Sequence, residues 1–124
     1  MRQVYSNSTA EAPVVIGNAA PIQDRDTGRI VLPFCRNNSQ VLLSFSDDDG
    51  LTWTHPRNIT SSVVQHGWNW VGLGPPSGIQ LASGRLLVPA YHGPFHWDDG
   101  TFTHPHTIYR YTAMAPEHHT THLA

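Results

Sequence analysis

The sequence predicts an all-β fold built from antiparallel strands. Charged residues make up 13% of its 124 residues, against about 25% in a typical soluble chain, while glycine and proline each occur 10 times. Short apolar runs recur about every ten residues, with turn-forming residues between them, and this spacing is typical of a sandwich, a barrel or a propeller. No segment shows a sustained helical period, so a helical bundle is not expected.

The first third of the chain supplies the clearest early elements. Residues 1–12 are expected to form an irregular lead-in, and a short apolar run follows at residues 14–16. Residues 24–28 predict a turn, because Asp and Gly supply local hydrogen bonds and a positive φ. Residues 29–34 predict a second strand, and Pro33 suggests the edge or the end of that strand.

The next segment shows the alternation of a half-buried strand. Over residues 40–46, Val41, Leu43 and Phe45 fall on one side, as expected for a strand with one face against a core. Residues 36–39, which precede this strand, are rich in Asn and Ser and predict a turn.

Beyond this strand the pattern becomes less regular. Residues 66–78 form a stretch rich in Trp and Gly, which predicts a loop. Short strands are expected at residues 79–81 and 85–91, with a tight turn between them. Residues 110–124 show neither a strand period nor a helical one, and we expect this His- and Thr-rich tail to be disordered.

Composition argues against several functional classes. The formal net charge is −2, so no net electrostatic attraction to nucleic acid is expected. Cys35 is the single cysteine, so an intrachain disulfide framework is excluded. No apolar run approaches the ~20 residues that span a bilayer. Acceptor motifs for N-glycosylation occur at Asn7, Asn37 and Asn58, and they matter only if the chain is secreted, so the compartment stays open.

One motif carries the strongest structural information. The pattern Ser-x-Asp-x-Gly-x-Thr-Trp, known as the Asp box, occurs at Ser46, Asp48, Gly50, Thr52 and Trp53. In a hairpin turn of this kind, Asp48 can accept backbone N–H groups and Gly50 can take a φ that other residues resist. Trp53 can bury its ring against the neighbouring strand. We therefore expect a structural role for these residues.

Two metal-binding alternatives fit the residues less well. A calcium loop around Asp47 and Asp49 would have Phe45 at its first ligand position, and no Glu follows at the required distance. The histidines that begin with His92 and His96 have no Cys pair beside them and no helix to align them, whereas zinc needs three or four ligands in a defined geometry. No metal or other cofactor is expected.

Further stretches resemble the sialidase family in order and spacing. Residues 17–21 follow its Gly-Asn-x-x-Pro loop and precede a Thr-Gly-x-Ile hairpin at residues 27–30. Residues 67–81 resemble a Trp-x-Trp element followed by Gly-Ile-Gln-Leu, and residues 83–92 continue as Gly-Arg-Leu-x-x-Pro-x-x-His. The resemblance covers roughly residues 13–95.

This resemblance implies a fold more specific than the strand pattern alone. It predicts a partial six-bladed β-propeller of about one and a half blades, with the Asp box at a hairpin. Residues 1–12 are then the lead-in, residues 13–109 the partial propeller domain, and residues 110–124 an aberrant tail. The hypothesis for this tail is a shifted reading frame or an unspliced intron, either of which would explain the loss of pattern. We expect the chain to be a fragment of a longer protein.

The resemblance also implies a chemistry. Sialidases remove terminal sialic acid with a Tyr nucleophile, a Glu that activates it, an Asp acid/base and arginines that bind the sugar carboxylate. None of these catalytic positions can be matched in this chain, so the fragment is expected to be inactive alone. Acidic and Arg residues that are present fall at turns or strands and are expected to be structural: Asp24, Asp26, Arg29, Arg36 and Arg85.

The substrate-binding positions implied by the resemblance are fewer. Asn18 falls on a family position that contacts polar groups of the sugar, and Tyr91 on one near its glycerol side chain. Gln80 and His92 are candidates by proximity. The alternatives are a turn-capping role for Asn18 and a half-buried strand aromatic for Tyr91. The Trp-x-Trp pair could stack on sugar, but core packing is the favoured interpretation for Trp68 and Trp70.

The functional expectation is therefore an exo-α-sialidase, with a sialylated glycan as its partner and neither nucleic acid nor a membrane segment involved. A non-catalytic glycan-binding propeller that keeps only the scaffold is the alternative. A purely structural β-domain with a chance Asp box is least favoured, because the other stretches match as well.

Overall fold

The computed structural model describes residues 4–6, 12–96, 98–102 and 110–114, and it confirms the predicted all-β class. All of its strand pairs are antiparallel. The elements are β1 (Ile16–Gly17), β2 (Ile22–Gln23), β3 (Ile30–Arg36), β4 (Gln40–Ser46), β5 (Arg57–Asn58), α1 (Thr60–Val63), β6 (Trp70–Leu73), β7 (Ile79–Gln80), β8 (Leu86–Gly93), β9 (Phe95–His96), β10 (Thr101–Phe102) and β11 (Arg110–Met114).

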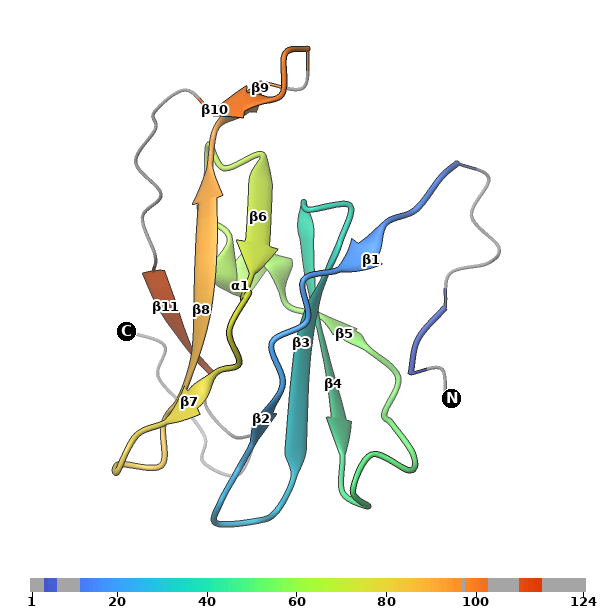
Figure 1. Cartoon of the computed structure of the whole chain (residues 1–124), viewed down its shortest axis with the longest axis vertical. Helices are drawn as coiled ribbons and strands as arrows, with labels where there is room; N and C mark the ends of the chain where they lie inside the picture. The colour runs from blue at the N-terminus through green and yellow to red at the C-terminus, as the bar shows by residue number, and fades with distance from the viewer. Residues whose placement is uncertain (1–3, 7–11, 97, 103–109, 115–124) are drawn as a thin grey trace.

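The first sheet has the order β1-β3-β4-β5, with β2 also paired to β3 (Figure 1). Its centre is the β3–β4 hairpin, which pairs continuously from Ile30 opposite Ser46 to Arg36 opposite Gln40. Asn37 and Asn38 turn the chain with φ angles of 53° and 48°, a conformation that Asn tolerates better than most residues. The predicted strand at residues 40–46 is confirmed at both ends.

Pro33 lies in the middle of β3, opposite Leu43, and not at an edge or end of the strand as predicted. The backbone of Pro33 faces the connection between β1 and β2, where its carbonyl accepts the Ala20 N–H at 3.1 Å. Along this edge of β3, Ile30 and Val31 pair with β2, and Cys35 and Arg36 pair with β1. Pro33 lies between these two pairings. Proline is tolerated here because its missing N–H falls in the gap between those two short strands.

The second sheet has the order β11-β8-β6, with β7 also paired to β8. Residues 70–73, inside the segment predicted as a loop, form β6 instead. The prediction followed the Trp and Gly content, whereas the strand forms because β8 offers a partner edge for its whole length. The β9–β10 hairpin, which the sequence analysis did not predict, follows β8 directly.

Two further elements correct the sequence analysis. Residues 110–114, expected to be disordered, form β11, which pairs with residues 86–90 of β8. The Tyr-Thr pair in this segment has high strand propensity, and the other edge of β8 supplies the backbone partners. The remaining tail, 115–124, lies outside the described residues. Residues 60–63 form the single-turn helix α1, which is too short to show a helical period in the sequence.

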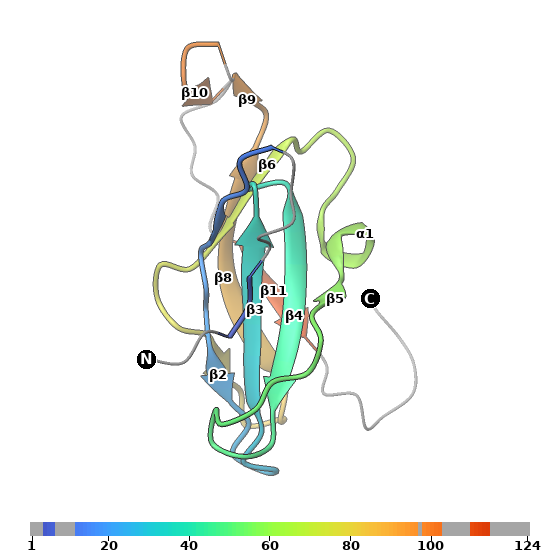
Figure 2. The same ribbon diagram turned by 90° about the vertical axis from the view of Figure 1, so that its right-hand side faces the viewer.

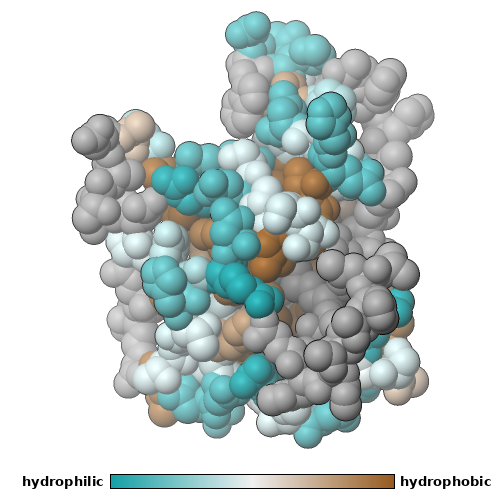
Figure 3. All heavy atoms as spheres, turned by 180° about the vertical axis from the view of Figure 1, so that it is seen from behind, coloured by the Kyte–Doolittle hydropathy of each residue, from teal (hydrophilic) through white to brown (hydrophobic). Residues whose placement is uncertain are grey.

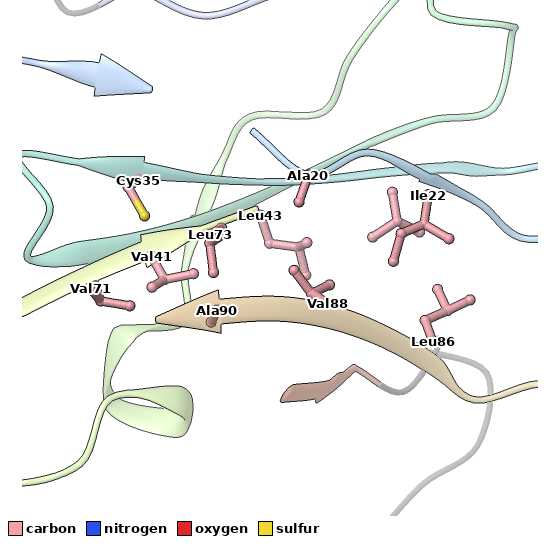
Figure 4. Close-up of a cluster of buried hydrophobic side chains, with 11 residues drawn as sticks. Ala20, Ile22, Cys35, Val41, Leu43, Val71, Leu73, Leu86, Val88 and Ala90 are labelled. Atoms are coloured by element: carbon pink, nitrogen blue, oxygen red, sulfur yellow. The ribbon is translucent and has the colours of Figure 1, made fainter. Parts of the chain in front are cut away.

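The core lies between the two sheets. Figure 4 shows Val41 and Leu43 from β4 facing Val71 and Leu73 from β6, with Val88 and Ala90 from β8 beside them. Phe45 is partly buried against the same cluster, so Val41, Leu43 and Phe45 share the core side as predicted. Leu42, Ser44 and Ser46 on the other side are buried as well, so β4 is not the half-buried strand that was expected. In Figure 1 the β3–β4 layer lies beside the β6–β8 layer, and in Figure 2 it lies in front of it.

The surface of the molecule carries both hydrophilic and hydrophobic residues. The face in Figure 3 intersperses hydrophilic and hydrophobic residues. Several large hydrophobic residues are exposed, among them the neighbours Val15 at 61% and Ile16 at 37%, and Leu51 at 57%. In the part of the chain that the structure describes, no helix is long and apolar enough to cross a membrane.

Candidate functional site

Asn18, Trp70 and Tyr91 converge on one point above Gly72. A Cβ atom placed on Gly72 would lie 2.7 Å from the Asn18 Nδ2, 2.7 Å from the Trp70 ring and 2.7 Å from the Tyr91 ring. Gly72 and Tyr91 are cross-strand partners in β6 and β8, which places them on the same face of the sheet. The absence of a side chain at Gly72 therefore lets an amide and two aromatic rings meet.

Asn18 reaches this point from the connection between β1 and β2. Its φ of 56° is in the left-handed region, which Asn adopts more readily than most residues. Neither the Asn18 amide nor the Tyr91 hydroxyl has a hydrogen bond with any other described residue, and both residues are only half-buried. A polar ligand could therefore bond to both groups without displacing a protein partner. We call Asn18, Trp70, Gly72 and Tyr91 the Gly72 cluster.

Phe95 extends the aromatic surface of the cluster. The Trp70 ring centroid lies 4.8 Å from that of Tyr91 and 6.2 Å from that of Phe95, with tilted planes. Asn69 fixes Phe95: its Oδ1 accepts the Phe95 N–H at 2.6 Å, and its Nδ2 donates to the Phe95 carbonyl at 2.8 Å. The sequence analysis missed Asn69 and Phe95, and it favoured core packing for Trp70, which instead belongs to this half-exposed group.

His92 lies on the opposite face of β8. Neighbouring residues of a strand point to opposite sides, so His92 shares the face of Val71 and not that of Tyr91. Its ring stacks on Trp68 with centroids 3.2 Å apart and planes 14° apart, and both ring nitrogens are buried. The structure thus does not bring His92 to the Gly72 cluster.

Gln80 is also separate from the cluster, because it connects the two sheets. Its Nε2 donates to Asp24 Oδ1 at 2.8 Å and to the Gly84 carbonyl at 3.3 Å, and its Oε1 accepts the Arg25 backbone N–H at 2.8 Å. Gln80 pairs with Leu86, which is roughly 17 Å from Tyr91 along an extended strand. Both the oxygen and the nitrogen of the Gln80 amide are thus hydrogen-bonded within the protein.

Asp24 completes this connection. Its side chain is 3% exposed and accepts the Thr27 hydroxyl at 2.7 Å and the Asp26 backbone N–H at 3.0 Å. These hydrogen bonds, that from Thr27 first, lower the pKa of the Asp24 carboxyl below its ordinary value, because they stabilise the ionised form. The turn at residues 24–28 and the structural role of Asp24 are as the sequence predicts.

The motif at residues 46–53 forms the expected tight turn after β4. Asp48 Oδ1 accepts the Thr52 backbone N–H at 2.8 Å and the Ser46 hydroxyl at 2.8 Å, while Oδ2 accepts the Thr52 hydroxyl at 2.6 Å. Gly50 has a φ of 80°. The Trp53 indole N–H donates to the Gly50 carbonyl at 3.1 Å, so the ring folds onto its own turn.

Asp48 gives this turn a dependence on pH. Hydrogen bonds, first that of the Thr52 side chain, lower the pKa of Asp48 from 3.8 to about 2. Its stabilising contribution is therefore complete above pH 3.8 and is lost as the pH falls through about 2. We expect Asp48→Asn to unfold at a lower urea midpoint than the parent chain at neutral pH, with the difference shrinking as the pH falls from 4 to 2. Circular dichroism at a series of pH values measures both midpoints.

Thr52→Val is the matched control for that measurement. It keeps the Asp48 carboxylate and the Thr52 backbone N–H but removes the hydroxyl that contributes most to the lowered pKa. Its midpoint should fall between those of the parent and Asp48→Asn at neutral pH. The account would be contradicted if the difference in urea midpoint between Asp48→Asn and the parent stayed constant from pH 7 to pH 2.

Other possible sites are less suited to a polar ligand. A cavity of about 380 Å³ lies against β3 and is lined mostly by apolar groups, including Leu32, Phe34 and Ile16. A charged sugar would lose its hydration there for few hydrogen bonds in return. Among the described residues, no three His, Cys, Asp or Glu side chains are grouped so as to hold a metal ion.

Comparison with known proteins gives one consistent group of relatives. The chain is 34% identical over 90 residues to Sialidase-3 of Rattus norvegicus, which covers 57% of this chain and 21% of that protein. It is 44% identical over 50 residues to an exo-alpha-sialidase of Aspergillus fumigatus, covering 40% of this chain and 12% of that protein. The chain thus spans about a fifth or less of the length of these relatives. No family model matches it.

A solved structure agrees with the sequence relatives. A Hadza microbial sialidase superposes with a TM-score of 0.59 at 29% sequence identity. The superposition covers 64% of this chain and 19% of that one. Sequence and fold therefore point to the same group of proteins.

Proposed function

Because this chain belongs with the sialidases, we propose that it forms part of an exo-α-sialidase and that the Gly72 cluster contacts the terminal sialic acid. The observation that carries the proposal is the meeting of Asn18 and Tyr91 at Gly72. These residues are 73 positions apart in the sequence (91 − 18), and the family resemblance assigns both to substrate contact. Their polar groups are open to a ligand beside an aromatic wall, as is common in sugar sites.

The proposal extends to the architecture. The two antiparallel sheets pack face to face over one core, as neighbouring blades of a propeller do. We propose that they are about one and a half blades of a six-bladed propeller. The similarity to a sialidase structure supports this arrangement.

The cluster is suited to binding rather than to bond cleavage. Asn18 offers amide donors and an acceptor, Tyr91 a hydroxyl, and Trp70 a flat ring. Hydrolysis by sialidases requires in addition a carboxylic acid and a Tyr nucleophile with its base. In the proposed enzyme, those groups and the arginines for the sugar carboxylate come from other parts of the propeller.

The same observation favours one alternative, a non-catalytic glycan-binding propeller. Hydrogen-bonding and stacking groups are sufficient to hold a sugar, and they are what the Gly72 cluster provides. Hydrolysis of a fluorogenic sialoside by the longer protein would separate the two: release of the fluorophore supports the enzyme, and binding without release supports the alternative.

Sialic acid binding by the chain tests the cluster. We expect 3′-sialyllactose to shift the Trp70 indole N–H signal in a ¹⁵N-labelled sample, with lactose causing no shift. Asn18→Ala and Tyr91→Phe should each weaken binding by about tenfold, the effect of losing one hydrogen bond to a ligand. Chemical-shift titration gives the affinities.

Tyr5→Phe is the matched control, because the Tyr5 ring contacts Phe34 on β3, with ring centroids 5.3 Å apart. It removes the same hydroxyl from a residue outside the cluster and should leave the affinity unchanged. Equal shifts with lactose and sialyllactose, or equal affinities for Tyr91→Phe and the parent, would overturn the assignment of the cluster.

A further inference from the structure

The N-glycosylation motifs differ in their structural settings. The motif Asn-x-Ser/Thr occurs at Asn7, Asn37 and Asn58, and the last two lie among the described residues. An oligosaccharide can be carried only where the Asn side-chain nitrogen faces solvent and has room around it. The two described motifs can therefore be compared directly.

Asn58 has the features of an acceptor. It lies on β5, the last strand in the order of its sheet (Figure 2), and the residue is exposed. Its Oδ1 accepts both the Thr60 hydroxyl at 2.6 Å and the Thr60 backbone N–H at 3.0 Å. Its Nδ2 donates to no other described residue. A glycan on Nδ2 would keep both bonds to Oδ1, so the modification is compatible with the fold.

Asn37 is held in a different way. It is half-buried in the β3–β4 turn with a φ of 53°, and its Oδ1 accepts the Val15 N–H at 2.8 Å. Its own N–H donates to the Val15 carbonyl at 2.8 Å. The Ser39 hydroxyl of this motif contacts the Arg36 carbonyl at 3.5 Å and not the Asn37 side chain. Asn37 is therefore half-buried beside the segment at Val15, whereas Asn58 is exposed.

We infer that Asn58 is the site of an N-linked glycan when the chain passes through the secretory pathway, and that Asn37 is not. The donor is a lipid-linked oligosaccharide diphosphate. The Asn58 Nδ2 forms a bond to the sugar C1 atom, the bond between C1 and the diphosphate oxygen breaks, and the diphosphate leaves with the electron pair. The amide nitrogen gives up one proton, and no oxidant or reductant is needed.

The test is expression of the full chain behind a cleavable secretion signal in eukaryotic cells. All variants carry Asn7→Gln, so that Asn37 and Asn58 are the remaining acceptors. Treatment with peptide N-glycosidase in ¹⁸O water converts each glycosylated Asn to labelled Asp, which mass spectrometry locates. We expect the label at residue 58 and none at residue 37.

Substitutions separate the motif from effects on folding. Asn58→Gln and Thr60→Ala should abolish the mobility shift that the glycosidase reverses, whereas Thr60→Ser and Asn37→Gln should retain it. Thr60→Ala leaves Asn58 itself in place, and Thr60→Ser keeps the hydroxyl that the motif requires. An unlabelled residue 58 in the parent, or any label at residue 37, overturns the inference.

Discussion

Replacing Gly78 by alanine should lower the free energy of unfolding by about 3 kcal/mol, the upper end of the usual cost of overpacking. A Cβ atom there would overlap the side chain of Ile22 and lie 2.6 Å from the Leu87 carbonyl oxygen. Ile22 is 5% exposed and is part of the core, while the Leu87 carbonyl belongs to the backbone of β8. Neither can withdraw without disturbing the contact between the sheets. Urea unfolding followed by circular dichroism measures the loss.

Gly17→Ala is the matched control for this prediction. A Cβ on Gly17 meets nothing within 4 Å, and its φ lies outside the left-handed region. Its unfolding free energy should stay within about 0.5 kcal/mol of that of the parent. If the two substitutions cost the same, the close approach of Gly78 to Ile22 is not what constrains this position.

The parts of the fold that the sequence predicted are those held by local interactions. The turn around Asp48 is encoded within eight positions, since its donors and acceptors lie between Ser46 and Trp53. The strand at residues 40–46 was predicted with both of its ends, because its alternation reports directly which side faces a core. Such patterns need no knowledge of distant partners.

The elements that the sequence did not predict depend on distant partners. β6 forms because β8 offers an edge and because the Asn38 carbonyl accepts the Val71 N–H at 2.6 Å. The hydrogen bond between Gln80 and Asp24 joins residues 56 positions apart, and no local sequence pattern predicts it. Tertiary context of this kind overrides the Trp and Gly content that had indicated a loop.

In the candidate site, too, some features could be predicted from the sequence and others depend on distant partners. The family resemblance could select Asn18 and Tyr91 one at a time, but their meeting depends on the missing side chain of Gly72, which only the packed sheets reveal. Gln80 and His92 were candidates by proximity alone. Proximity along a strand fails as a guide, because His92 follows Tyr91 directly and yet faces the opposite side.

Truncating Leu86 should be about as costly as the glycine substitution. Leu86 is 1% exposed and projects from β8 into the core, with Ile22 on the facing layer (Figure 4). Leu86→Ala leaves a cavity between the sheets and should cost about 3 kcal/mol of unfolding free energy. Leu51→Ala, at a side chain that is 57% exposed, removes the same atoms at the surface and should cost under about 0.5 kcal/mol.

A double-mutant cycle with Ile22→Val extends this test to the contact between the sheets. Leu86 and Ile22 belong to different sheets but to one core cluster, so their truncations should be non-additive by about 0.5 kcal/mol or more. Additive costs, together with a loss below about 1 kcal/mol for Leu86→Ala, would mean that the two sheets do not share a core in solution. Because Asn18 comes from the first sheet and Tyr91 from the second, the Gly72 cluster exists only if the sheets pack together. Loss of sialyllactose shifts in the same variant would then follow from the packing defect.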